Sequence, residues 1–228
     1  MKKAYLPSTD LDFRSLATLL VSGGLFTAVA WAVSADWLTG FDTWLLLSLR
    51  NAADPADPLG PAWLERAIRD LTALGGNPVL TLVTLGSVGW LWVQRKTPEA
   101  GWLLLSIVAG VSLSYLLKAG FARPRPEIVT QGQMVYTASF PSGHAMNTAV
   151  VYLSIGLIAA HGQCSRATRT LALGLPALLS LAVGCSRVYL GVHWPSDVIA
   201  GWSVGLAWVS VCWLAAGTFW TRMLGGEE

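Results

Sequence analysis

The sequence predicts an all-α fold: a polytopic six-helix transmembrane bundle with interfacial amphipathic helices in its first outer loop. Of its 228 residues, 54% are hydrophobic and only 12% are charged, and the mean hydropathy is +0.53. A soluble domain has about 25% charged residues, so this composition argues against an ordinary soluble enzyme. Backbone groups find no hydrogen-bond partner in lipid, so each segment that crosses the bilayer is expected to be helical.

Six charge-free apolar runs are candidates for membrane spans. A span needs roughly 20 largely apolar residues. The fifth run is short and contains Pro176, which makes it the least typical of the six. The predicted spans are Leu16–Val33, Pro78–Val93, Gly101–Leu117, Ala145–Ala160, Thr170–Gly184 and Val198–Phe219.

The first run also has features of a secretory signal. Met1-Lys2-Lys3 is basic, and the run ends in small residues at Val33-Ser34-Ala35. The apolar stretch is longer than a typical signal core, and Arg14 borders it as a membrane anchor does. We therefore interpret the run as a retained first span.

Charge predicts the orientation of the bundle. With six spans, both termini lie on one side, together with eight of the 15 basic residues and five of the 13 acidic ones. The other side then has the remaining seven basic and eight acidic residues. Cytoplasmic loops carry an excess of Lys and Arg, so we expect cytoplasmic termini in the inner (cytoplasmic) membrane and outer loops on the periplasmic or extracellular side. The eight basic residues are Lys2, Lys3, Arg14, Arg95, Lys96, Arg166, Arg169 and Arg222.

No repeat or low-complexity tract divides the chain, so residues 1–228 are interpreted as a single domain. The outer loop 41–76 contains two amphipathic pieces, Asp42–Arg50 and Trp63–Leu74, separated by a proline-rich stretch that cannot continue a helix. Helices of this kind suit a membrane interface. Two interpretations stay open: a wall or lid for lipid entry, or a connector packed on the bundle.

Three charged clusters, far apart in the sequence, fall at the outer ends of predicted spans. The first cluster follows the third span and contains Lys118, Arg123-Pro124 and Arg125-Pro126. Arg binds phosphate oxygens with a planar fork, while Lys supplies a mobile point charge. Lys118 alone is typical of a membrane anchor. With the arginines, it predicts a phosphate-binding loop.

The second cluster is Pro141-Ser142-Gly143-His144, at the outer start of the fourth span. Ser142 can cap the helix, and Gly143 lets an anion approach the backbone closely. The unpaired N–H groups and the dipole of the helix favour an anion at the same place. His144 is then expected beside the bound group.

The third cluster precedes the sixth span and contains Ser186-Arg187, His193 and Asp197. If the helix has begun by Pro195, residues 193 and 197 lie about one turn apart. Asp197 can then hold one imidazole nitrogen of His193 and direct the other outward, as nucleophilic catalysis requires. Because all three clusters map to one side of the bundle, we predict a single active site there.

Together these motifs resemble the signature of the type 2 phosphatidic acid phosphatase superfamily, which includes membrane lipid phosphatases, bacterial acid phosphatases and vanadium haloperoxidases. All three motifs occur in order and at the family's spacings within residues 118–197. The resemblance implies an integral membrane lipid phosphatase that works through a phosphohistidine intermediate. The substrates it implies are undecaprenyl diphosphate, phosphatidylglycerol phosphate or phosphatidic acid, with a lipid A phosphatase as a further possibility.

The resemblance also implies a role for each residue. His193 attacks phosphorus, Asp197 orients His193, and His144 protonates the leaving oxygen and later activates water. No metal or other cofactor is implied, because cationic side chains and a helix N-terminus neutralise the transition state. The implied partners are a lipid phosphate and the membrane, with no nucleic acid. The residues implied to bind phosphate are Lys118, Arg125, Ser142, Gly143 and Arg187.

Three alternatives are consistent with the same motifs. A phosphotransferase passes phosphate from His193 to a second lipid instead of water. A non-catalytic protein binds or transports anionic lipid in the basic pocket, although such a protein has no need of the pairing between His193 and Asp197. A haloperoxidase shares the motif, but a transmembrane bundle provides no evident halide chemistry.

Overall fold

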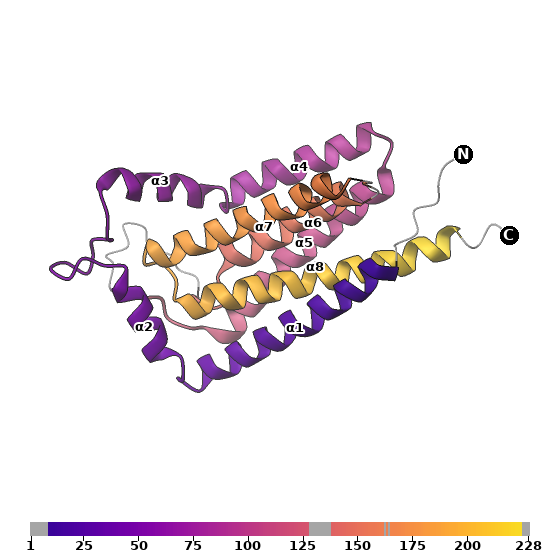
Figure 1. Ribbon diagram of the computed structural model, residues 1–228. Helices are drawn as coiled ribbons and strands as arrows, with labels where there is room; N and C mark the ends of the chain where they lie inside the picture. Colours follow the sequence, from indigo (N-terminus) through magenta and orange to yellow (C-terminus); the bar gives the residue numbers. More distant parts are fainter. Residues whose placement is uncertain (1–8, 128–137, 162, 164, 225–228) are drawn as a thin grey trace.

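The computed structural model describes residues 9–127, 138–161, 163 and 165–224. Within these residues the chain forms eight α-helices and no β-strand (Figure 1). The helices are α1 (Thr9–Ser34), α2 (Thr39–Ser48), α3 (Ala62–Ala73), α4 (Asn77–Val93), α5 (Thr97–Phe121), α6 (Gly143–Ala160), α7 (Arg166–Tyr189) and α8 (Pro195–Leu224).

Five of these helices, α1, α5, α6, α7 and α8, are long and apolar enough to cross a membrane. The predicted second span is α4, which has only 17 residues. Taken together, α3 and α4 also qualify, but they bend by 46° at their junction. The all-α transmembrane bundle predicted from the sequence is therefore confirmed, with five spans or with six when the bent pair counts as one.

The predicted fifth span is longer than the sequence indicated. Helix α7 continues through Pro176 and extends beyond the predicted Thr170–Gly184 at both ends. A Cβ atom at Gly156 of α6 would lie 2.5 Å from the carbonyl oxygen of Ala172 and 2.9 Å from the ring of Pro176. The missing side chain at Gly156 thus gives the proline turn of α7 room to pack on α6.

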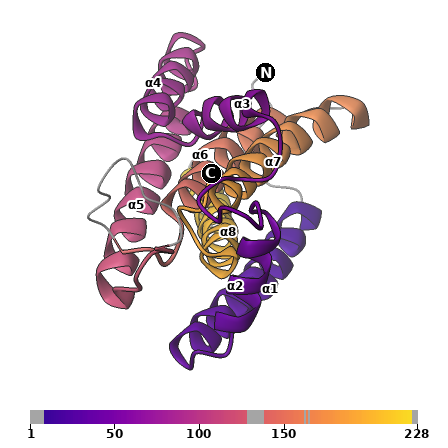
Figure 2. The same ribbon diagram turned by 90° about the vertical axis from the view of Figure 1, so that its left-hand side faces the viewer.

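The start of α1 and the end of α8 lie at the same end of the bundle, opposite α2 (Figure 1). Viewed from the end that carries α2, α6 and α8 lie in the middle, flanked by α1, α4, α5 and α7 (Figure 2). Most residues of α6 are buried, including Met146 and Val150, which belong to the main hydrophobic core. The central helices begin at the end of the bundle where the predicted site residues gather.

Glycines of α8 bring its backbone against α6. A Cβ atom at Gly201 would lie 2.7 Å from the carbonyl oxygen of Ser142, and one at Gly205 would lie 2.8 Å from the Cβ of Ala149. Small residues allow helices in membranes to approach closely. The first turn of α6 is therefore fixed against the first turns of α8.

The outer loop 41–76, called the outer segment below, forms the two helices predicted for it, shifted by a few residues. Helix α2 begins three residues before the predicted Asp42, and α3 carries an ion pair between Glu65 and Arg69 on its exposed face. The segment is tied to the bundle by Arg50, which donates a 2.6 Å hydrogen bond to the carbonyl of Tyr189. Helices α2 and α3 pack against α8 and α7 respectively.

We expect Gly201→Ala to lower the unfolding temperature in detergent, because the added methyl group overlaps the carbonyl of Ser142. Overpacking of this kind destabilises by about 1–3 kcal/mol. Gly174→Ala in α7 is the control, since a Cβ atom there meets nothing within 4 Å. That change is expected to leave the unfolding temperature unchanged or to raise it. Equal unfolding temperatures for the two variants would contradict the close contact between α6 and α8.

Candidate active site

His193 lies between α7 and α8, and only 2% of its surface is exposed. Its Nδ1 atom is 3.4 Å from Oδ2 of Asp197 and 3.3 Å from the hydroxyl of Ser139. Its Nε2 atom is 3.2 Å from Nη1 of Arg125. A guanidinium only donates hydrogen bonds, so Nε2 accepts here and Nδ1 carries the proton. The lone pair of Nε2 therefore points toward the basic loop.

Burial lowers the pKa of His193 from 6.5 to about 3. The positive charges of Arg125 and Lys118 act in the same direction, whereas the hydrogen bond and the charge of Asp197 oppose it. Burial prevails, so the imidazole is neutral at physiological pH. Neutral imidazole is the form that can act as a nucleophile.

Asp197 has no exposed surface and holds His193 from the first turn of α8. Helix α8 begins at Pro195, as the spacing required. Besides His193, the carboxylate accepts hydrogen bonds from the hydroxyl of Ser139 and from the backbone N–H of Trp194, at 3.0 Å. The carboxylate is thus fixed in orientation, and it fixes the imidazole in turn.

Lys118 lies directly beside Gly143 at the site. Lys118 lies in the last turn of α5 and donates a 2.8 Å hydrogen bond to the carbonyl of Ala138. A Cβ atom at Gly143 would lie 3.3 Å from Cε of Lys118, so the glycine leaves the lysine room beside the start of α6. Lys118 interacts electrostatically with Arg125, Arg187 and Asp197. The predicted cationic residues are therefore brought together.

Arg125 and Arg187 each donate a hydrogen bond to an uncharged oxygen atom. Arg125 donates a 2.8 Å hydrogen bond to the carbonyl of Val192, and burial lowers the pKa of its guanidinium. Arg187, in the last turn of α7, donates to the hydroxyl of Thr72 in α3 at 3.1 Å. Both guanidinium groups interact electrostatically with Lys118, so they belong to one cationic cluster.

Two buried polar atoms at the site have no hydrogen-bond partner among the described residues: Nε of Arg187 and the hydroxyl of Ser142. Ser142 is the residue that precedes α6, as predicted, but its side chain makes no capping bond. Its N–H group donates instead to the carbonyl of Asp197 at 2.9 Å. The hydroxyl is turned into the protein interior at the positive end of α6, where an anion is favoured.

His144 occupies the first turn of α6 and packs against the junction of α3 and α4. A Cβ atom at Gly75 would lie 3.0 Å from Cδ2 of His144 and 2.5 Å from Val183. Only glycine at position 75 leaves room for this imidazole. His144 interacts electrostatically with His193 and Arg187, so it belongs to the same cluster.

The sequence placed Arg123 in the phosphate-binding loop, but its patterns predicted neither Asp42 nor the ion pairs that hold Asp197. Arg123 donates to Oδ1 of Asp197 at 2.6 Å and to Oδ2 of Asp42 in α2 at 2.8 Å. Asp42 has no exposed surface and also accepts from the N–H of Ser196 at 2.8 Å. One signal was available: Asp42 is the only acid of the amphipathic piece Asp42–Arg50, and it lies between Phe41 and Trp44.

The described residues offer no evident metal site. No group of three or more His, Cys, Asp or Glu side chains in the described part of the chain is arranged to hold a metal ion. The cluster is instead built from a buried imidazole, a carboxylate, cationic side chains and a helix N-terminus. That combination can bind a phosphate group and present a nitrogen nucleophile to it.

We expect Asp42→Asn to destabilise the protein, because it removes one of the two carboxylates that neutralise the largely buried Arg123. Breaking a buried ion pair costs about 3–5 kcal/mol. Thermal unfolding in detergent measures the effect. Asp70→Asn on the exposed surface of α3 is the matched control and should unfold like the wild type. An Asp42→Asn protein as stable as this control would show that the buried pair contributes nothing.

The chain also matches a known protein family. The model of the PAP2 superfamily matches residues 99–221, which is 123 of the 228 residues. The match begins in α5 and ends in α8, so it includes all the residues of the cluster that the sequence predicted.

Individual relatives are similar over comparable lengths. The chain is 34% identical to phosphatidylglycerophosphatase B of Bacillus subtilis over 150 residues, which cover 63% of this chain and 71% of that protein. It is 31% identical to decaprenylphosphoryl-5-phosphoribose phosphatase of Mycobacterium tuberculosis over 150 residues, covering 64% and 76% respectively. The fold matches the crystal structure of a transmembrane PAP2 type phosphatidylglycerolphosphate phosphatase from Bacillus subtilis with a TM-score of 0.74. That match has 23% identity and covers 92% of this chain and 98% of the other.

Proposed function

This chain belongs to the PAP2 superfamily, and from that membership we propose that it is a metal-independent membrane lipid phosphatase whose nucleophile is His193. One observation carries the proposal. The buried, neutral imidazole of His193 directs the lone pair of Nε2 toward Arg125. Lys118 and Arg187 belong to the same cationic cluster. This arrangement suits attack on a phosphorus atom whose oxygens are held by cations.

Substrate binding can free the nucleophile. Arg125 now donates to Nε2 of His193. A phosphate oxygen competes for the same donor, because a charge-assisted hydrogen bond to an anion is stronger than one to a neutral nitrogen. The lone pair then faces phosphorus while Arg125 holds the phosphate. Lys118, Arg187, the hydroxyl of Ser142 and the backbone N–H of Gly143 supply the remaining contacts in this proposal.

The reaction then proceeds in two steps. In the first step, the bond between Nε2 and phosphorus forms while the bond from phosphorus to the leaving oxygen breaks, and His144 gives that oxygen a proton. Asp197 stabilises the positive charge that develops on the imidazole. In the second step, water attacks phosphorus, His144 takes its proton, and phosphate leaves His193. The cations and the start of α6 stabilise both transition states.

The substrate class follows from the setting and from the relatives. The site lies at one end of a bundle whose helices can cross a membrane, and the names of the relatives describe phosphatases of lipids. We therefore assign a phosphomonoester or diphosphate of a lipid, with phosphatidylglycerol phosphate, undecaprenyl diphosphate and phosphatidic acid as the candidates. We also propose an inner membrane location. The distribution of Lys and Arg favours cytoplasmic termini and an active site on the periplasmic or extracellular side.

Purified protein in detergent is expected to release phosphate from at least one of these three lipids in the presence of EDTA. His193→Ala should lower the rate by at least about a thousandfold, and His144→Asn by about 100-fold to 10,000-fold. His161→Gln, at the opposite end of α6, is the control and should keep full activity. Equal amounts of released phosphate and consumed lipid distinguish hydrolysis from phosphotransfer. Retention of more than a tenth of the activity by His193→Ala would exclude this nucleophile.

The pH dependence should be bell-shaped, because the reaction needs neutral His193 and protonated His144. Burial lowers the pKa of His193, so the acidic limb is expected below pH 6.5. The charge of Asp197 raises this pKa, so Asp197→Asn should move the acidic limb to still lower pH while it reduces the rate. Measurement of kcat/KM between pH 3.5 and 9.5 tests both shifts. An acidic limb that moves to higher pH in Asp197→Asn would contradict the assignment.

A further inference from the structure

We propose that a groove between α4, α5 and α6 binds a hydroxyl group of a glycerol-based lipid, and that Asn147 determines this specificity. The inference rests on the lipid phosphatase proposed above and narrows its substrate class. The groove has a volume of about 480 Å³. Its outer wall includes Leu85 and Val108, which are 58% and 56% exposed on the surface of the bundle. A lipid in the membrane can therefore reach it from the side.

The groove begins one helical turn from the active site on each of its walls. On α5, Tyr115 lies three residues before Lys118, and on α6, Asn147 lies three residues after His144. Three helical residues span about 4.5 Å. On the third wall, Asn77 follows shortly after Gly75, against which His144 packs. A lipid whose phosphate is bound at the site can thus extend its next few atoms into the groove.

Asn147 is the polar side chain of this groove that most needs a ligand. It is 94% buried, since only 6% of its surface is exposed, and its Oδ1 atom has no hydrogen-bond partner among the described residues. Two hydroxyls of the groove are already paired: Thr84 donates to the carbonyl of Leu80, and Ser112 to that of Val108. Burial of an unpaired amide is unfavourable, so a ligand that pairs with it gains affinity.

The chemistry of the unpaired atom selects the ligand. The Oδ1 atom of Asn147 accepts hydrogen bonds without carrying charge, so it suits a hydroxyl group of the ligand. The cations of the active site take the phosphate instead. In phosphatidylglycerol phosphate, the free hydroxyl of the headgroup glycerol lies within a few bonds of the leaving oxygen. The hydrocarbon chain of a polyprenyl phosphate has no such group, so it leaves Asn147 unpaired.

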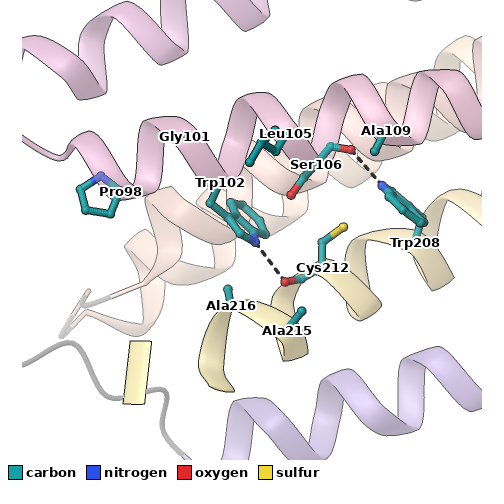
Figure 3. A pocket seen from close by; sticks show the side chains of 10 residues that line it. All are labelled: Pro98, Gly101, Trp102, Leu105, Ser106, Ala109, Trp208, Cys212, Ala215 and Ala216. Atoms are coloured by element: carbon teal, nitrogen blue, oxygen red, sulfur yellow. Dashed lines mark hydrogen bonds between the residues drawn. The ribbon is translucent and has the colours of Figure 1, made fainter. Parts of the chain in front are cut away.

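A second cavity, of about 620 Å³, offers no comparable group (Figure 3). It lies between α5 and α8, toward the start of α5 and away from Lys118. The indole N–H groups of Trp102 and Trp208 both donate to backbone carbonyls, at 3.0 and 2.9 Å. With these donors satisfied, the cavity gives no sign of recognising a polar lipid group.

The first test compares two phosphomonoester substrates, dioleoyl phosphatidylglycerol phosphate and a polyprenyl monophosphate. Asn147→Leu, which keeps the size of the side chain, is expected to lower kcat/KM for phosphatidylglycerol phosphate about tenfold and to change that for the polyprenyl monophosphate less than twofold. Ser154→Ala is the matched control, because its hydroxyl is also buried and unpaired on α6 but does not line the groove. It should affect neither substrate. Equal losses on both substrates in Asn147→Leu, or no loss on either, would overturn the proposal.

The second test measures binding without turnover. His193→Ala protein in nanodiscs is titrated with phosphatidylglycerol phosphate, and so are the double variants that also carry Asn147→Leu or Asn147→Ala. Weaker binding of phosphatidylglycerol phosphate in both double variants, with unchanged binding of the polyprenyl monophosphate, supports the groove. Unchanged binding of phosphatidylglycerol phosphate overturns it. Because binding does not depend on hydrolysis, selective binding by a wild-type protein that releases no phosphate would overturn only the phosphatase.

Discussion

The buried ion pairs of Arg123 with Asp197 and Asp42 are the interaction on which the site depends. A carboxylate as deeply buried as Asp197 is unfavourable without a compensating charge. Arg123 supplies that charge and is itself shared with Asp42, so α2, the loop after α5 and the start of α8 are joined through one guanidinium. The outer segment thus does more than connect two spans, because one of its side chains helps to hold the residue that orients His193.

Backbone packing brings the other half of the site to this network. Gly201 lets α8 approach α6 so closely that the N–H of Ser142 bonds to the carbonyl of Asp197. The nucleophile and the positive end of α6 are therefore placed by the same helix contact. A shift of either helix would separate the group that attacks from the groups that bind phosphate, and a small displacement of this kind is costly in catalysis.

The sequence was sufficient for the elements that depend on local pattern. Apolar length predicted the spans, and residue chemistry at the helix ends predicted the cluster around His193. Hydropathy did not predict that α4 qualifies as a membrane span only together with α3. It also did not predict that Gly156 of α6 accommodates Pro176 of α7. Both features depend on neighbouring helices. Asp42 and Asn147 were missed for the same reason. A polar side chain within an apolar helix shows neither its partner nor its burial until the helices are packed.

The environment of His193 reconciles two opposite requirements. Asp197 must hold the imidazole, yet its charge alone would raise the pKa of His193 and protonate the nucleophile. Burial and the charges of Arg125 and Lys118 lower the pKa further than Asp197 raises it, so the ring is both oriented and neutral. A bound phosphate adds negative charge and favours protonation once more. The cations that bind the phosphate therefore also assist burial, which is the larger effect, in keeping the nucleophile unprotonated.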